Sequence, residues 1–123
     1  MPEQFDTNVL NQLAHIDEID IETYSSAGET HRIIIWVIVD DHKVYVRSFR
    51  GDRGRWYQEI KANPVAAIHM DGQRLPVRAV PVTDEETITS VSNEILRKYH
   101  NSNSARSMVR EEVLPTTLQL EPV

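Results

Sequence analysis

The amino-acid sequence predicts an α+β fold with a mainly antiparallel sheet, and three observations carry this prediction. Asp71-Gly72 separates two strand-like runs, residues 65–70 and 73–82, and Asp-Gly is a strong signal for a two-residue hairpin turn. A second turn, at residues 40–42, joins two further β-branched runs. The stretch 83–86 places threonine three residues before glutamate, the capping box that starts a helix.

The chain begins with a predicted helix over residues 6–15. Phe5, Val9, Leu10 and Leu13 recur at helical spacing, and Asp6 or Thr7 is available as the cap. Residues 18–24 then alternate between apolar and polar side chains, which predicts a half-buried strand.

Residues 30–40 predict one long strand, because residues 33–39 are β-branched or aromatic throughout. A strand that is apolar on both faces must be covered on both faces. The second face of this strand is covered by a barrel interior, a helix or another subunit. The turn at 40–42 leads into a strand at 44–48, so the two runs form a hairpin.

The second half of the chain continues this pattern. A short helix begins near Gly54 and ends at Asn63-Pro64, because proline excludes the preceding residue from the helical region. The helix at 84–99 has a stripe of Ile88, Val91 and Ile95, and residues 116–121 alternate as a last strand. We count six strands. We expect one domain over residues 1–123, with an N-terminal helical segment at 1–15 and the sheet within 16–121.

Composition narrows the function classes. The chain has 123 residues, a formal net charge of −6 and no cysteine, so disulfides and thiolate metal sites are excluded. The first residues lack the basic and apolar parts of a signal peptide, and no apolar run is long enough to cross a bilayer. We therefore expect a cytoplasmic protein. The acidic balance argues against general nucleic-acid binding.

One window reverses this charge. Four arginines, Arg47, Arg50, Arg53 and Arg55, face one acid, Asp52, so residues 47–55 carry +3. Glycines accompany the arginines at a strand-to-helix turn, an arrangement that suits a bound anion such as phosphate. The alternative is a solvated loop paired with the chain's acids.

The order of elements and the residues of this window resemble the FMN-binding split-barrel superfamily, the fold of pyridoxamine 5′-phosphate oxidase. The closest resemblance is to an uncharacterised bacterial family akin to the deazaflavin-dependent nitroreductases. It covers roughly residues 16–121. The residues that carry it are Val44-Tyr45-Val46, Ser48, Gly51, Gly54, Trp56-Tyr57 and Ala62-Asn63-Pro64.

The resemblance implies a six-stranded split β-barrel, a homodimer and a flavin held at the dimer interface. It implies a flavin- or deazaflavin-dependent oxidoreductase that acts on a small molecule, with FMN favoured because the turn lacks the lysine and paired glycines of the deazaflavin proteins. The cofactor-binding residues that it implies are Arg47, Ser48, Arg50, Arg53 and Arg55 for the phosphate, and Trp36 beside the ring. Arg47 is expected to be the main phosphate ligand, because a strand holds its side chain better than a turn would.

Other interpretations stay open. Trp36 lies within an apolar strand, so it also suits core or interface packing. The chain has no hydrolase elbow or Walker sequence, and its histidines show no metal-ligand spacing, so the sequence indicates no catalytic residue and no metal site. A cofactor-free binding or scaffolding module is the main alternative. A phosphoprotein or nucleic-acid binder that uses the arginine turn is the third.

Overall fold

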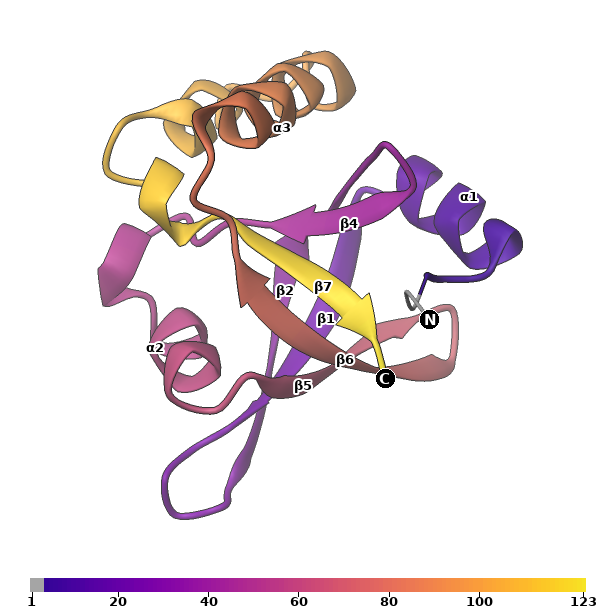
Figure 1. The fold of residues 1–123 in the computed structure, drawn as a ribbon, viewed down its shortest axis with the longest axis vertical. Coiled ribbons are helices and arrows are strands. Elements are labelled where there is room, and N and C mark those ends of the chain that lie inside the picture. Colours follow the sequence, from indigo (N-terminus) through magenta and orange to yellow (C-terminus); the bar gives the residue numbers. More distant parts are fainter. Residues whose placement is uncertain (1–3) are drawn as a thin grey trace.

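The computed structural model describes residues 4–123 (Figure 1). Residues 1–3 of the expected N-terminal segment lie outside the described residues. The α-helices are α1 (Thr7–His15), α2 (Arg55–Ala62) and α3 (Glu85–Lys98), and the short 3-10 helices are η1 (Gly51–Arg53), η2 (Arg106–Val109) and η3 (Leu114–Thr116). The strands are β1 (Glu18–Tyr24), β2 (Thr30–Trp36), β3 (Ile38–Asp40), β4 (Lys43–Val46), β5 (Val65–Met70), β6 (Gln73–Pro81) and β7 (Leu118–Pro122).

The strands form one curled antiparallel sheet in the order β2-β1-β5-β6-β7-β4-β3. The α+β class is confirmed and the curled sheet is consistent with the predicted split barrel, but the sheet has seven strands where six were predicted. The difference arises at residues 30–40, which form two strands, β2 and β3, at opposite edges of the sheet.

Val37 is the residue at which the long predicted strand breaks. Its N–H donates to Tyr99 Oη at 3.2 Å, and its carbonyl accepts from Lys98 Nζ at 2.7 Å. Side chains from the end of α3 therefore satisfy the backbone groups that a continuous strand would pair with a neighbour.

Both predicted hairpins are confirmed, and their turns explain their register. Asp71 and Gly72 have φ values of 51° and 77°, and Asp41 and His42 have φ values of 52° and 66°. Two successive positive φ angles are typical of the primed turns that match the twist of antiparallel strands.

The strand β2 is covered only in part by its own chain. Ile35 is buried, but Ile33 and Ile34 keep 49% and 60% of their surface exposed. Within one chain the apolar strand is thus covered only in part, which leaves an apolar edge on the sheet.

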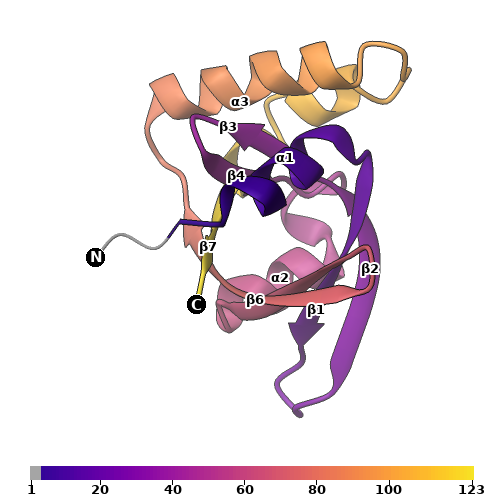
Figure 2. The ribbon, with the colours of Figure 1, turned by 90° about the vertical axis from the view of Figure 1, so that its right-hand side faces the viewer.

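The helix α3 lies across one end of the sheet and contacts β3 (Figures 1 and 2). Val91 and Ile95 of the predicted stripe pack against Ile38 and Tyr45, while Ile88 is half-buried. The cap of α3 is Asp84 rather than Thr83, because Asp84 has the extended conformation of a cap and its Oδ2 accepts from Thr87 N at 2.9 Å. In the described part of the chain, no helix combines the length and apolarity needed to span a membrane.

Candidate functional site

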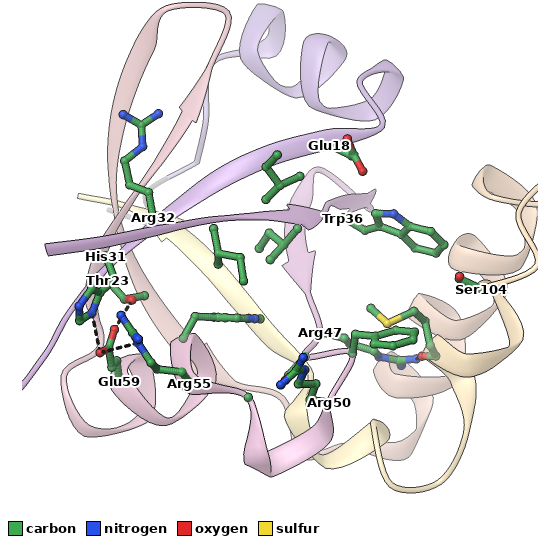
Figure 3. A pocket seen from close by; sticks show the side chains of 18 residues that line it. Glu18, Thr23, His31, Arg32, Trp36, Arg47, Arg50, Arg55, Glu59 and Ser104 are labelled. Carbon is green, nitrogen blue, oxygen red and sulfur yellow. Dashed lines mark hydrogen bonds and ion pairs between the residues drawn. The ribbon is translucent and has the colours of Figure 1, made fainter.

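A cavity of about 670 Å³ opens between β2 and the segment that leads from β4 into α2 (Figure 3). Its lining includes five of the six predicted site residues, which are Trp36, Arg47, Ser48, Arg50 and Arg55. Arg53 is exposed and is not part of this lining. The curled sheet thus brings β2, with Trp36, over the arginine turn.

Aromatic and aliphatic side chains form much of the cavity wall. Trp36, Phe49, Trp56 and Met108 take part, together with the three isoleucines of β2. Trp36 stacks on Tyr99 with a 3.8 Å distance between ring centroids and 5° between the planes. One face of the Trp36 indole is therefore occupied by the protein itself. A flat apolar ligand fits such a wall.

Arg47 is 2% exposed, and its guanidinium is held by the protein. Its Nε donates to Thr117 Oγ1 at 2.8 Å, and its Nη2 donates to the carbonyl of Ile88 at 2.8 Å. Its Nη1 donates to Ser92 Oγ at 2.9 Å and to the carbonyl of Met108 at 3.0 Å. Burial lowers the pKa of Arg47 to about 10.

These contacts do not fit the expectation that Arg47 is the main phosphate ligand. A guanidinium has five N–H groups, and four hydrogen bonds to protein groups leave one. The residue instead connects the segment after β4 with α3, η2 and the residue before β7. Binding of the cofactor phosphate by Arg47 stays a prediction.

Ser48 and Gly54 form a tight corner at the floor of the cavity. The Ser48 backbone N–H donates to Thr116 Oγ1 at 3.0 Å, whereas Ser48 Oγ is buried without a hydrogen-bond partner among residues 4–123. Gly54 precedes α2 and provides no side chain to cap it. The corner therefore combines an unused hydroxyl with a helix start that lacks a capping side chain, and both favour an anion.

Arg50 and Arg55 are the exposed arginines that the turn contributes to the cavity wall, and Arg32 of β2, also exposed, is paired with Asp20 at 2.9 Å. Arg55 is 69% exposed, and its Nε lies 3.8 Å from Glu59 Oε2. Within residues 4–123, Arg50 and Arg53 form no ion pair, so the salt-bridged loop considered from the sequence describes Arg55 alone. Two guanidinium groups are thus available to a ligand at this wall.

Sequence reasoning missed the polar cluster at the α2 end of the cavity, Thr23, His31 and Glu59. Glu59 Oε1 accepts from Thr23 Oγ1 at 2.7 Å, and Glu59 Oε2 lies 2.8 Å from His31 Nδ1. Thr23 and His31 face each other across β1 and β2. No spacing of residues in the sequence predicts this cluster, because its members come from three different elements. In the described residues, no group of histidines and carboxylates is arranged to hold a metal ion.

Residues 9–120 match the family model described as "Uncharacterized protein conserved in bacteria (DUF2255)". The chain belongs to this family. The match spans nearly all of the sheet and every residue of the cavity wall. No curated protein matches the sequence of this chain.

The fold of this chain is similar to those of several solved structures, three of which are described here. HutZ, the heme storage protein from Vibrio cholerae, is 10% identical with a TM-score of 0.72, and the match covers 98% of this chain and 91% of that one. An F420-H2 dependent reductase, FDR-A, is 17% identical with a TM-score of 0.67, covering 85% and 94%. A putative pyridoxamine 5′-phosphate oxidase from Listeria innocua is 15% identical with a TM-score of 0.63, covering 94% and 90%.

At these identities the likeness shows the fold alone. It agrees with the fold that the resemblance implied, and the family match confirms the resemblance to an uncharacterised bacterial family.

Proposed function

We propose that this chain binds a phosphorylated flavin-type cofactor in the cavity beneath β2, with FMN as the favoured candidate. We further propose that it acts as an oxidoreductase on a small molecule. The observation that carries the proposal is the composition of one wall. Aromatic side chains, Trp36, Phe49 and Trp56, stand beside two exposed arginines, Arg50 and Arg55. A flavin phosphate joins a flat apolar ring to a dianion, and this wall offers a partner for each part.

The polar corner fits the phosphate as well. Ser48 Oγ has no partner among residues 4–123, and Gly54 keeps the floor open because a side chain there would enter the space of Ser48. We assign the phosphate to Arg50, Arg55 and Ser48, with Arg47 as the buried support behind them. When bound, a flavin supplies the redox chemistry, and the side chains of the cavity bind it, orient it and exclude water.

Structural relatives favour a redox or tetrapyrrole cofactor over other ligand classes. One is described as an F420-H2 dependent reductase and another as a heme storage protein. The arginine pair favours FMN, because a phosphate monoester is compact and suits bidentate arginine contacts.

We further propose a homodimer. The exposed isoleucines of β2, Ile33 and Ile34, line the cavity together with exposed Phe49. A second copy placed over β2 would remove these side chains from water and close the cavity. We expect an interface that buries about 2,000 Å² or more in total. The single-domain organisation and the cytoplasmic location expected from the sequence stay predictions.

The experiment is a binding comparison with purified protein. FMN, riboflavin, F420 and haem are each titrated, and binding is followed by absorbance and by the change in melting temperature. We expect FMN to raise the melting temperature most, since only a ligand that binds the folded state stabilises it. Equal stabilisation by riboflavin would contradict the phosphate assignment, and a stronger effect of haem would move the protein to a different cofactor class.

A cofactor-free binding module is the second candidate, and Arg47 favours it. Arg47, the arginine expected from the sequence to be the main phosphate ligand, uses its guanidinium to make four hydrogen bonds to other parts of the protein. If none of the four ligands binds, the cofactor-free module becomes the better account of this chain.

A further inference from the structure

A histidine–carboxylate pair lies at the α2 end of the cavity (Figure 3). His31 Nδ1 is 2.8 Å from Glu59 Oε2, and Thr23 Oγ1 donates to the other oxygen of Glu59 at 2.7 Å. Thr23 and His31 are cross-strand partners, so their side chains share the face that meets Glu59 from α2. All three residues contribute to the cavity wall.

Glu59 is held in its ionised form. Burial alone would raise the pKa of Glu59, but hydrogen bonds from Thr23 and His31 and the charges of His31 and Arg55 bring this pKa below its ordinary value. An ionised carboxylate only accepts hydrogen bonds. The 2.8 Å contact therefore requires that His31 Nδ1 carries a proton.

This arrangement leaves His31 Nε2 available. In the neutral ring the lone pair lies on Nε2, because Nδ1 holds the proton. Nε2 has no hydrogen-bond partner among residues 4–123, and the His31 side chain is 30% exposed at the cavity. A carboxylate that fixes the tautomer of a histidine and leaves the second nitrogen open is a common device for proton transfer.

We propose that His31 is the acid–base group of the cavity and that Glu59 is its positioning residue. When His31 acts as an acid, the Nε2–H bond breaks and its electron pair stays on Nε2, while the proton forms a bond to a lone pair of the bound ligand. The ring is then neutral with its proton on Nδ1, Glu59 remains a carboxylate, and solvent returns a proton to Nε2. The identity of the ligand rests on the proposed function, whereas the tautomer of His31 and the ionised form of Glu59 do not.

The other histidines do not share this arrangement. His69 also meets a carboxylate, but its Nε2 is the atom that contacts Glu22, at 2.7 Å. His15 and His100 contact backbone carbonyls of their own segments, and His42 lies in the β3–β4 turn. The charged groups that line the cavity together with His31 are Glu18, Arg32, Arg47, Arg50, Arg55 and Glu59.

The test is long-range ¹H–¹⁵N NMR of the histidine rings at about pH 8.5, some two units above the ordinary pKa of histidine. We expect the wild-type protein to show a protonated Nδ1 and an unprotonated Nε2 for His31. In Glu59→Ala we expect loss of this signature and a shift toward the Nε2–H form that free imidazole side chains prefer in water. His69 serves as the internal control, since its partner Glu22 is untouched by the substitution.

FMN is then added as the probe of the cavity. We expect the His31 Nε2 resonance to move on binding, while His42, which does not line the cavity, stays in place. A wild-type His31 that holds its proton on Nε2 would overturn the proposal, and this measurement stands alone if Glu59→Ala does not fold. FMN that binds without moving His31 Nε2 would also overturn it and leave the proposed function intact. If FMN does not bind while the Glu59-dependent Nδ1–H form is present, the pair is supported and the proposed function fails.

Discussion

Gly54 packs so closely against Ser48 that a Cβ on Gly54 would lie 2.4 Å from Ser48 Oγ. The next atoms, the Gly51 carbonyl oxygen and Ser48 Cβ, would lie at 3.6 and 3.7 Å, which are ordinary contacts. The φ of Gly54 is −62°, a value that any residue adopts, so the glycine is required by space and not by conformation.

We therefore predict that Gly54→Ala lowers the free energy of unfolding by about 1–3 kcal/mol, the usual cost of overpacking. Ser48→Ala removes the clashing oxygen, so the double variant Ser48→Ala/Gly54→Ala is expected to recover most of this loss. Urea unfolding of the four proteins gives the coupling energy. Additive effects of the two substitutions would show that the Ser48 hydroxyl is not what excludes a side chain at position 54.

Arg47 is predicted to stabilise the fold. Arg47→Met removes four hydrogen bonds that connect the segment after β4 with α3, η2 and Thr117, and we expect the free energy of unfolding to fall by about 3–5 kcal/mol. Chemical denaturation measures the change. Arg53→Ala is the matched control, because Arg53 is exposed and is expected to change stability by less than about 0.5 kcal/mol. Equal effects of the two substitutions would contradict the structural role of Arg47.

Glu22 predicts a loss of stability in acid. Hydrogen bonds from Arg74, Tyr24 and His69 outweigh burial and lower the pKa of Glu22 from 4.5 to about 2. A carboxyl whose pKa is lower in the folded state stabilises the fold above its unfolded pKa. This contribution should therefore be complete above about pH 4.5 and disappear as the pH falls toward 2.

Urea unfolding of wild type and Glu22→Gln between pH 6 and about pH 2.5 tests this dependence. The wild-type free energy of unfolding should fall more steeply below pH 4.5 than that of the variant, which cannot ionise at this position. Parallel curves would mean that Glu22 does not carry the acid sensitivity.

The exposed edge of β2 predicts the oligomeric state. We expect a dimer at micromolar concentration by light scattering, and a monomer for Ile34→Asp, because a charge cannot be buried unpaired in an apolar interface. Leu96→Asp provides the matched control, since Leu96 is 41% exposed on α3, away from the cavity lining. A monomeric wild type, or equal dissociation by both substitutions, would refute the assignment of the interface to β2.

Local signals in the sequence were sufficient for most elements. Asp71-Gly72, Asn63-Pro64 and the alternation of residues 18–24 each specify a turn, a helix end or a strand within a few residues, and the structure confirms them. The break at Val37 could not be predicted in this way. It depends on Lys98 and Tyr99, which lie about sixty positions further along the chain and act only once the fold is formed.

The sequence predicted five residues that line the cavity, but it did not predict the contacts that each of them makes. Clustered arginines and glycines predicted an anion site at the turn, yet they did not distinguish buried Arg47 from exposed Arg50. That difference is set by partners in α3 and η2 and by Thr117, all distant in the sequence. His31 and Glu59 were missed for the same reason, because the pair exists only where β2 meets α2.

The measurement that tests the central claim most directly is the ratio of the dissociation constants of riboflavin and FMN, obtained by flavin fluorescence. Each charge-assisted arginine–phosphate contact contributes roughly 1.5–3 kcal/mol, so wild type should bind FMN at least about tenfold more tightly than riboflavin. In the double variant Arg50→Ala/Arg55→Ala the ratio should fall toward one while riboflavin affinity is kept, and Arg53→Ala should retain the wild-type ratio. Equal binding of FMN and riboflavin by wild type would contradict a phosphate site at Arg50 and Arg55.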